Sequence, residues 1–222
     1  MSNQDSSNTT KKSTVYVALI TALAIIVGSV ILGIGGQTTP QETTPEAAPA
    51  VELPTAGITD SNKASISFTT NQGEIVIETI PSLAPLTVNA IAALAQKNYF
   101  DNTICHRLTT EGIFVLQCGD PTGTGTGGPG FTIPDENLPE AVENNYPAGT
   151  VAMANAGPGT SGSQFFLVYQ DTTLGPDYTI WGSITSGLDI LQTIASAGVV
   201  DGGADGAPLT GVTIESTKVT IS

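Results

Sequence analysis

The chain has 222 residues, with 20 Asp and Glu against 6 Lys and Arg and a formal net charge of −14. This acidic balance argues against a nucleic-acid partner, because neutralising phosphates requires clustered Lys and Arg. A single His and two Cys exclude most His/Cys metal sites and any disulfide-dense scaffold. With 40% hydrophobic and only 12% charged residues, the chain is not a disordered polyelectrolyte and is expected to contain a folded domain.

A long apolar run lies near the N-terminus. Residues 14–36 contain no charge and no Pro, and about 20 such residues span a bilayer core as a helix. Lys11 and Lys12 precede the run, so the positive-inside rule predicts a cytoplasmic N-terminus at 1–13 and an extracytoplasmic remainder. The alternative is a cleaved signal peptide, whose apolar core has about 7–15 residues. We therefore expect a single-pass transmembrane anchor at 14–36, and the composition favours a bacterial cell envelope.

Residues 37–62 follow as a segment rich in Pro, Thr, Glu and Ala without apolar periodicity. Such a segment buries too little surface to offset its chain entropy, so it is predicted to be an extended linker. The remaining residues, 63–222, are numerous enough to bury a hydrophobic core.

Short alternating runs and two amphipathic stretches fill residues 63–222. Runs 64–70 and 74–80 flank a Gly-containing turn and predict a β-hairpin. Apolar residues at helical spacing predict helices over 85–97 and 187–195. Further strands are expected at 104–108, 114–118, 150–154, 164–169, 179–184 and 213–221. This pattern predicts a mostly β fold, a closed antiparallel barrel with helices capping its ends.

Several polar residues and Gly-rich stretches interrupt these runs. Arg107 stands in an otherwise apolar strand; it either points to solvent or has a function, since Arg is seldom buried unpaired. Gln117, also inside an apolar strand, is either a satisfied core amide or a ligand contact. Residues 120–130 formally contain G-x-G-x-x-G, but Pro129 and the residues after it do not open a helix. Backbone freedom explains these glycines better than phosphate binding does.

Together these residues resemble the cyclophilin family of peptidyl-prolyl cis-trans isomerases. The resemblance rests on His106-Arg107, on QCGDPTGTGTGG at 117–128, and on MANAGP through GSQFF at 153–166. It covers nearly all of residues 63–222. It implies an eight-stranded antiparallel barrel capped by two helices. It also implies isomerisation of X-Pro bonds, which needs no cofactor or metal. Together with the expected anchor, this predicts that the substrates are exported or envelope proteins whose folding the isomerase assists.

The resemblance also assigns the site. Arg107 corresponds to the family's catalytic arginine, and Gln117 to the glutamine that helps hold substrate. The proline pocket and peptide groove would be lined by Phe114, Val115, Gly125, Ala154, Asn155, Ala156, Gln164, Phe166, Leu174 and Tyr178. Tyr178 falls where many relatives have His, and Thr173 where some have Trp. Because the indole donor is missing, we expect weakened binding of cyclosporin-type inhibitors.

These residue types suit the reaction. Rotation about an amide faces a barrier of about 18–20 kcal/mol, because conjugation is lost in the twisted state. No bond is broken, so an apolar slot for the proline ring and a charged donor such as Arg107 suffice. The alternatives are a proline-peptide binding or chaperone module with incidental or no catalysis, and a cell-surface adhesion or scaffold protein.

Three further residues have structural interpretations. His106 is the only His, yet no Ser or Cys nucleophile with an acid partner accompanies it, so a structural role is expected. Cys105 and Cys118 lie in neighbouring predicted strands of a domain expected to be exported. Disulfides persist outside the cytoplasm, so these two residues either form a cross-strand bridge or remain buried thiols.

Overall fold

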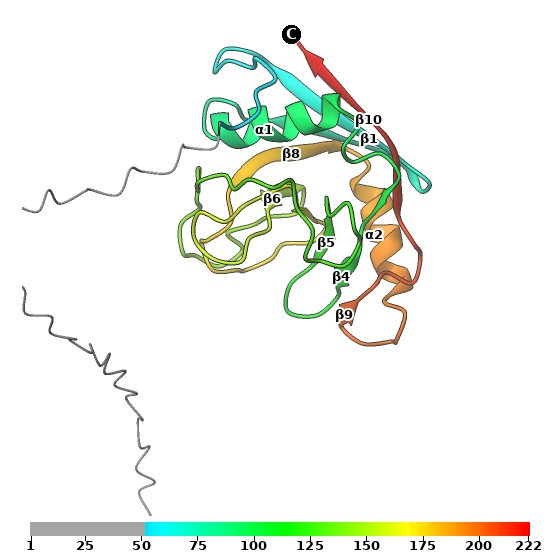
Figure 1. Cartoon of the computed structure of the whole chain (residues 1–222). Helices are drawn as coiled ribbons and strands as arrows, with labels where there is room; N and C mark the ends of the chain where they lie inside the picture. The colour runs from blue at the N-terminus through cyan, green and yellow to red at the C-terminus, as the bar shows by residue number, and fades with distance from the viewer. Residues whose placement is uncertain (1–51) are drawn as a thin grey trace, which may run out of the picture. The chain divides into compact units, whose positions relative to one another are not determined.

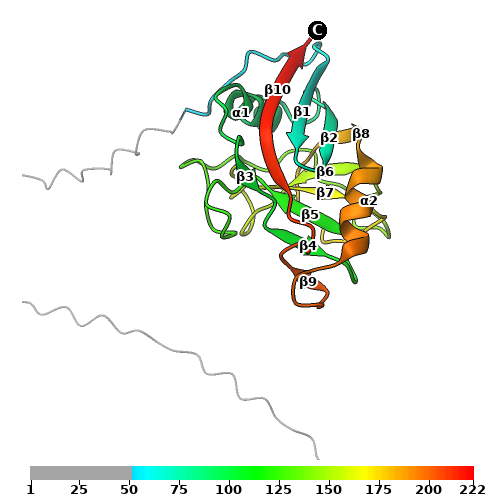
Figure 2. The same cartoon turned by 90° about the vertical axis from the view of Figure 1, so that its right-hand side faces the viewer.

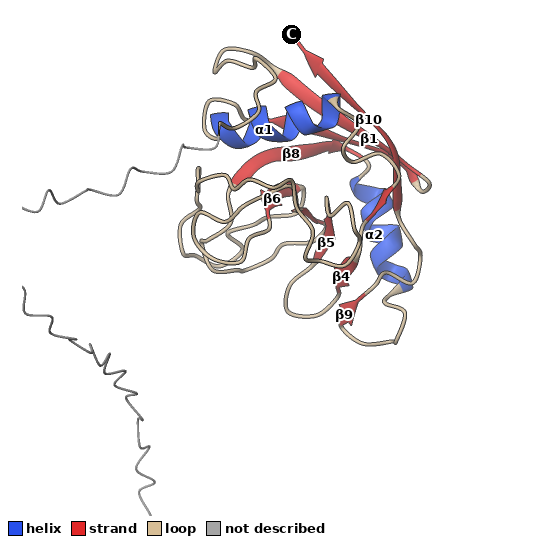
Figure 3. Ribbon diagram, in the orientation of Figure 1, coloured by secondary structure: helices blue, strands red, loops and turns tan. Residues whose placement is uncertain are grey.

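A computed structural model describes residues 52–222, which contain ten strands and two helices (Figure 1, Figure 3). The helices are α1 (Pro85–Gln96) and α2 (Leu188–Ala197). The strands are β1 (Ala64–Thr70), β2 (Gly73–Thr79), β3 (Thr103–Ile104), β4 (Arg107–Thr109), β5 (Val115–Cys118), β6 (Thr150–Met153), β7 (Phe165–Val168), β8 (Ile180–Ser186), β9 (Asp205–Gly206) and β10 (Thr213–Ile221). The mostly β fold with two helices is confirmed.

All ten strands belong to one antiparallel sheet, in the order β3-β10-β1-β2-β8-β6-β7-β5-β4-β9. The sheet is strongly curled (Figure 1, Figure 2), but no strand pairing within residues 52–222 joins β3 to β9. The prediction of a closed eight-stranded barrel was therefore wrong. The physical reason lies in the expected strand 104–108, which is interrupted at Cys105 and His106. There the chain passes from β3, one edge strand of the sheet, to β4, which neighbours the other edge strand β9. The two edges are thus connected by this stretch of backbone and not by strand pairing.

The predicted helices lie close to their expected limits. α1 begins at Pro85, whose fixed φ and missing N–H suit the first turn of a helix. α2 follows Gly187, which adopts φ 91°, and it continues to Ala197, two residues beyond the expected end. α1 packs beside β10 and α2 beside β2 (Figure 2).

The main core lies on the concave side of the curled sheet. Alternation along β1 and β2 directs Ile66 and Phe68, and likewise Ile75 and Ile77, into it. The ring centroid of Phe68 lies 5.3 Å from that of Phe165 in β7, so the two halves of the sheet meet in aromatic packing. The opposite face of β5, β6 and β7 carries a second, smaller apolar cluster that includes Val115, Ala152 and Phe166, and the site is built on this face.

The folded part begins before residue 63. Leu53, Ala56 and Ile58 pack against the core, although the sequence predicts a linker throughout 37–62. The side chain of Asn89 in α1 explains this: its Oδ1 accepts hydrogen bonds from the N–H groups of Ala56 (3.2 Å) and Ile58 (2.9 Å). A few apolar contacts and hydrogen bonds to one side chain thus hold this segment, and hydrophobic periodicity does not reveal either.

The expected anchor at 14–36 lies outside the described residues. Neither helix within residues 52–222 has the length and apolar character needed to cross a membrane.

Candidate active site

Four adjacent strands carry the site as one row of side chains. Arg107 of β4 lies opposite Gln117 of β5, Gln117 opposite Phe166 of β7, and Phe166 opposite Ala152 of β6. Directly opposed residues in antiparallel strands project from the same face. Strand register therefore places a cation, an amide and an apolar surface side by side, on the face opposite the main core.

A hollow of about 170 Å³ opens along this row. A cavity of about 150 Å³ is known to admit a benzene ring, so this hollow accommodates a five-membered ring. Its lining combines apolar side chains with a polar rim. The lining residues are Arg107, Ile113, Val115, Gln117, Ala154, Asn155, Phe166, Leu174 and Tyr178.

The hollow rests on a rigid aromatic base. Tyr146 is fully buried, and its ring contacts those of Phe166 and Tyr178 at centroid distances of 6.1 and 6.2 Å. Its hydroxyl donates to the Tyr178 carbonyl and accepts from the Tyr178 N–H, both at 3.1 Å. Burial raises the pKa of Tyr146 to about 12, so its hydroxyl stays a neutral donor. This arrangement holds one wall of the hollow in place.

Phe114 is not part of the hollow, contrary to the expectation from the family resemblance. Its ring packs instead against Tyr169 at a centroid distance of 6.0 Å, beside the main core. Ile113 takes the expected position, because alternation from Val115 and Gln117 places Ile113 on their face.

A chain of hydrogen bonds runs along the polar rim. The Nη1 of Arg107 donates to Gln117 Oε1 (3.3 Å), and the Nε2 of Gln117 donates to Gln164 Oε1 (2.8 Å). The Nε2 of Gln164 in turn donates to the carbonyls of Gly125 (3.0 Å) and Gly127 (2.9 Å). The predicted catalytic pair is thus connected to the Gly-rich loop.

The other side of the guanidinium contacts an acid. The Nε and Nη2 of Arg107 donate to the two carboxylate oxygens of Asp205 at 2.8 and 2.7 Å. The hydrogen bond from Arg107 holds the pKa of Asp205 below its usual value, and the same bond raises the pKa of Arg107. Both groups are therefore charged at neutral pH.

A second, larger hollow adjoins the first and shares Gln117, Ala154 and Asn155 with it. Its volume is about 940 Å³, and its lining includes Gly125, Ala156 and Gln164, as the family resemblance leads us to expect of a peptide groove. The side chain of Asn155 donates a hydrogen bond to the Asp177 carbonyl (2.8 Å) and accepts one from the Gly157 N–H (3.1 Å).

The Gly-rich loop is organised by one buried carboxylate, Asp120, which is fully buried. Its oxygens accept hydrogen bonds from the N–H groups of Thr122 (2.7 Å), Gly125 (2.6 Å) and Gly127 (3.0 Å). Burial alone would raise the pKa of Asp120, but the hydrogen bonds from Thr122, Gly127 and Gly125 hold it well below its usual range. Asp120 therefore remains an anion that shapes the groove wall.

His106 lies beneath this loop rather than in the hollow. A Cβ added at Gly125 would lie 3.5 Å from the His106 Cδ2, so the ring lies beside the loop and fills the space that a side chain at Gly125 would face. Neither ring nitrogen has a hydrogen-bond partner among the described residues. Burial lowers the pKa of His106, which favours the neutral form. This position suits a packing role.

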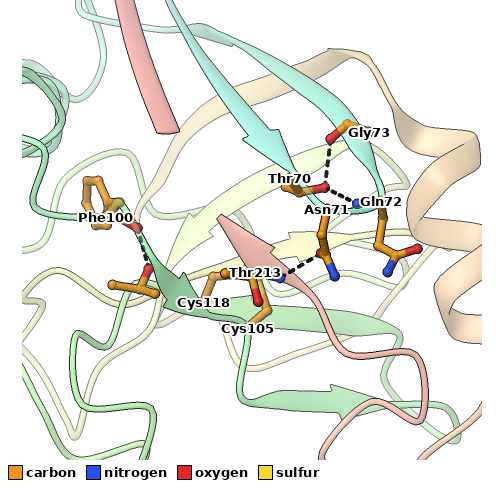
Figure 4. Close-up of a disulfide and its surroundings, with 9 residues drawn as sticks. Thr70, Asn71, Gln72, Gly73, Phe100, Cys105, Cys118 and Thr213 are labelled. Atoms are coloured by element: carbon orange, nitrogen blue, oxygen red, sulfur yellow. Dashed lines mark hydrogen bonds between the residues drawn. A yellow bond between two sulfur atoms is a disulfide. The ribbon is translucent and has the colours of Figure 1, made fainter. Parts of the chain in front are cut away.

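The structure joins Cys105 and Cys118 by a disulfide across a sequence separation of 13 residues. Both residues are buried, and the N–H of Cys105 donates to the Val212 carbonyl at 3.0 Å. Figure 4 shows the bridge beside Thr213, whose N–H donates to Asn71 Oδ1 (2.8 Å). Cys118 directly follows Gln117 in β5, and Cys105 lies two residues before Arg107, so the bridge links β5 to the segment that leads into β4.

Sequence reasoning did not identify Asp205, Ile113, Tyr146 or Asp120 as part of the site. Ile113 could have been found from strand alternation, and Asp120 from its place before a Gly-rich turn. Asp205 and Tyr146 lie in segments without periodicity, and their contacts are long-range. Within residues 52–222, no group of three or more His, Cys, Asp or Glu side chains is arranged to hold a metal ion.

Comparison with known proteins identifies the family. The model of the cyclophilin type peptidyl-prolyl cis-trans isomerase/CLD family matches residues 65–219, so the chain belongs to this family. The probable peptidyl-prolyl cis-trans isomerase B of Mycobacterium tuberculosis is 48% identical over 184 residues, covering 77% of this chain and 60% of that protein. Its counterpart from Mycobacterium leprae is 47% identical over 187 residues, covering 78% of this chain and 63% of that protein. This chain thus spans about 60% of the length of these curated relatives.

A crystal structure shares the fold. The cyclophilin type isomerase of Cryptosporidium parvum, determined in the presence of the dipeptide Ala-Pro, is 31% identical to this chain with a TM-score of 0.61. The match covers 70% of this chain and 98% of that structure.

Proposed function

We propose that this protein is a peptidyl-prolyl cis-trans isomerase that acts on X-Pro bonds of peptide segments. One observation carries the proposal: the guanidinium of Arg107 lies at the rim of a hollow of about 170 Å³ that Val115 and Phe166 help to line, and it is held between Asp205 and Gln117. Family membership supports the same activity.

The proline ring would enter the hollow against Val115 and Phe166, which are buried beneath it. The peptide on either side would lie along the larger groove, where Asn155 contributes a main chain that makes no hydrogen bond within residues 52–222. Fixing the ring leaves the preceding residue free to rotate about the X-Pro bond.

Arg107 provides the part of the interaction that changes during rotation. As the amide twists, conjugation is lost and the prolyl nitrogen becomes pyramidal and basic. A charged, preorganised donor in a partly dry site then stabilises the twisted state more than the planar ones. Apolar contacts hold planar and twisted forms about equally, so they give affinity but no acceleration.

The test compares the full chain with Arg107→Ala in a proline-isomerisation assay on an Ala-Pro peptide. We expect peptide affinity within a few-fold of wild type and turnover lower by about 10²–10³, as for the loss of other preorganised donors. Arg107→Lys, which keeps the charge without the planar fork, is expected to fall between. Undiminished turnover in Arg107→Ala would overturn the mechanism. A wild-type chain that binds the peptide without accelerating isomerisation would instead identify a binding or chaperone module.

We further propose that residues 14–36 anchor the protein in a bacterial cell membrane, with residues 1–13 in the cytoplasm and the isomerase domain outside. The support is the uncharged apolar run behind Lys11 and Lys12. A disulfide between Cys105 and Cys118 is compatible with an oxidising compartment. The clients would then be exported or envelope proteins.

This placement is tested by fractionating cells that produce the full chain or a variant lacking residues 1–36. The full chain is expected in the membrane fraction after alkaline extraction, with its C-terminal domain open to protease added from outside. The shortened variant is expected in the soluble fraction. A full chain recovered as soluble protein would refute the anchor.

Inhibitor binding follows from the residues at the hollow. Thr173 is exposed and accepts a hydrogen bond from the Asn144 N–H (2.8 Å), so it offers no large aromatic surface. We therefore propose weak cyclosporin binding, which isothermal titration calorimetry would measure.

A further inference from the structure

Arg107 is the only arginine of the chain, and both oxygens of one carboxylate engage it. The Asp205 oxygens accept from Nε (2.8 Å) and Nη2 (2.7 Å), the two-point geometry that matches a guanidinium fork to a carboxylate. The side chains are only partly covered, with 39% of Arg107 and 54% of Asp205 exposed. A pair so open to water contributes little to stability, which directs attention to what it does for the arginine.

The backbone around Asp205 is built to hold the carboxylate in register. β9 pairs with β4 so that Asp205 lies opposite Thr109. Thr109 and Arg107 project from the same face, which makes Asp205 the diagonal neighbour of Arg107. The loop before β9 is tied down by a hydrogen bond from the Thr110 N–H to the Ala204 carbonyl (2.8 Å). The position of Asp205 thus depends on strand pairing and not on a mobile loop.

We propose that Asp205 is the positioning residue of Arg107: it grips the outer edge of the guanidinium so that the inner edge faces the hollow. This inference rests on the proposed isomerase function and extends it to a residue outside the hollow's lining. Of the five N–H donors of Arg107, two go to Asp205 and one to Gln117 (3.3 Å), which leaves two for the substrate. Without the carboxylate, a long side chain that is 39% exposed regains its rotamer freedom and leaves the rim.

Asp205 could also affect turnover by neutralising the charge of Arg107, and this effect is distinguishable from positioning. If the carboxylate acted mainly by neutralising the guanidinium, its removal would strengthen the positive field at the twisted amide, and turnover would rise. Positioning predicts that turnover falls. The two effects therefore differ in sign, and one substitution separates them.

The experiment uses the full chain and the isosteric variant Asp205→Asn, with Asp205→Ala as a second variant and Asp201→Asn as control. Asp201 lies exposed in the loop before β9 and makes no ion pair within residues 52–222, so its substitution removes one charge without touching Arg107. We expect both Asp205 variants to lose about tenfold or more in kcat, with KM changed less than twofold. The Asp201 control is expected to stay within twofold of wild type.

A spectroscopic readout reports the pair without reference to activity. Because the chain has a single arginine, its ¹⁵N–¹H spectrum contains a single arginine Nε–Hε signal. In wild type this signal is expected to be sharp and slow to exchange with water, and in Asp205→Asn to broaden or vanish. An Asp205→Asn variant that keeps wild-type kcat, or exceeds it, overturns the inference, and so does an unchanged Nε–Hε signal. If Arg107→Ala is inactive while Asp205→Asn is fully active, the isomerase function stands and only the role of Asp205 fails.

Discussion

Substitution of Asp120 by Asn tests how the Gly-rich loop is held. The carboxylate is fully buried; one oxygen accepts from the Thr122 N–H and hydroxyl, and the other from the N–H groups of Gly125 (2.6 Å) and Gly127 (3.0 Å). Asn has the same shape, but its NH₂ group replaces one acceptor and faces two N–H donors. A fully buried donor left without an acceptor costs about 1–3 kcal/mol, and the N–H groups of Gly125 and Gly127 are only partly buried. We therefore expect a loss of about 2 kcal/mol in the free energy of unfolding.

Urea unfolding of the full chain measures this loss. Trp181 is the only Trp and is fully buried, so its fluorescence reports the unfolding of this domain. The matched control is Asp171→Asn, because Asp171 is exposed and accepts one backbone hydrogen bond, from Ala148 (2.9 Å). The control is expected to change stability by less than about 0.5 kcal/mol. A loss in Asp120→Asn no larger than the control's would show that the carboxylate does not organise the loop.

The same carboxylate predicts a pH dependence. Hydrogen bonds hold the pKa of Asp120 well below its usual range in the folded state, whereas the unfolded chain has a pKa of about 3.9. The unfolded state therefore binds the proton first, and the stabilisation is fully present above the unfolded pKa. It is lost as pH falls through that value toward the folded pKa. The stability difference between wild type and Asp120→Asn is thus expected to be constant from pH 8 to 6 and to shrink below about pH 4. A difference that stays constant down to pH 3 would contradict this assignment.

Three further predictions concern the bridge, a glycine and the wall of the hollow. Replacing Cys105 and Cys118 together by Ala is expected to lower stability by about 3 kcal/mol, the chain-entropy value for a loop of this length; non-reducing mass measurement of wild type that finds two free thiols would refute the premise. Gly119→Ala is expected to cost about 3 kcal/mol in urea unfolding, because Gly119 has φ +87° and an added Cβ would clash with the Ser163 carbonyl. Gly112→Ala, with φ +74° and open space around it, is expected to cost only about 1 kcal/mol; equal losses would exclude the clash. Ile113→Ala is expected to raise the KM for an Ala-Pro peptide about fivefold, because about 1 kcal/mol of apolar contact is lost. Phe114→Ala is expected to lower stability without raising KM. The reverse pattern would show that Phe114, and not Ile113, lines the proline pocket.

Local pattern predicted most of the strands and both helices, because each buries one face against a common core. Alternation over 64–70 and 74–80 is matched by β1 and β2, and the last strand has the expected bounds of 213–221. The closed barrel was not correctly predicted, because the break at Cys105 and His106 concerns backbone hydrogen bonding between distant segments. Side-chain hydrophobicity carries no signal for such a break.

In the site, too, some residues could be predicted from local sequence patterns, and others depend on contacts between distant segments. Arg107 and Gln117 attract attention as polar residues in apolar strands, and strand pairing places them opposite each other. Asp205 lies in β9, a strand of only two residues that exists because it pairs with β4. Arg107 in β4 and Asp205 are 98 residues apart in the sequence. Its role follows from register, which single-sequence patterns do not specify across such a distance.

Register also explains why Phe114 was misplaced. A one-residue shift along a strand moves a side chain to the other face, so a family correspondence that is correct in sequence can be wrong in orientation. In β5 the face is decided by Gln117, which must reach both Arg107 and Gln164. Once Gln117 faces the groove, Val115 and Ile113 face it too, and Phe114 is left on the core side with Tyr169. The hydrogen bonds of Gln117 to Arg107 and Gln164 therefore determine which apolar side chains can receive a proline ring.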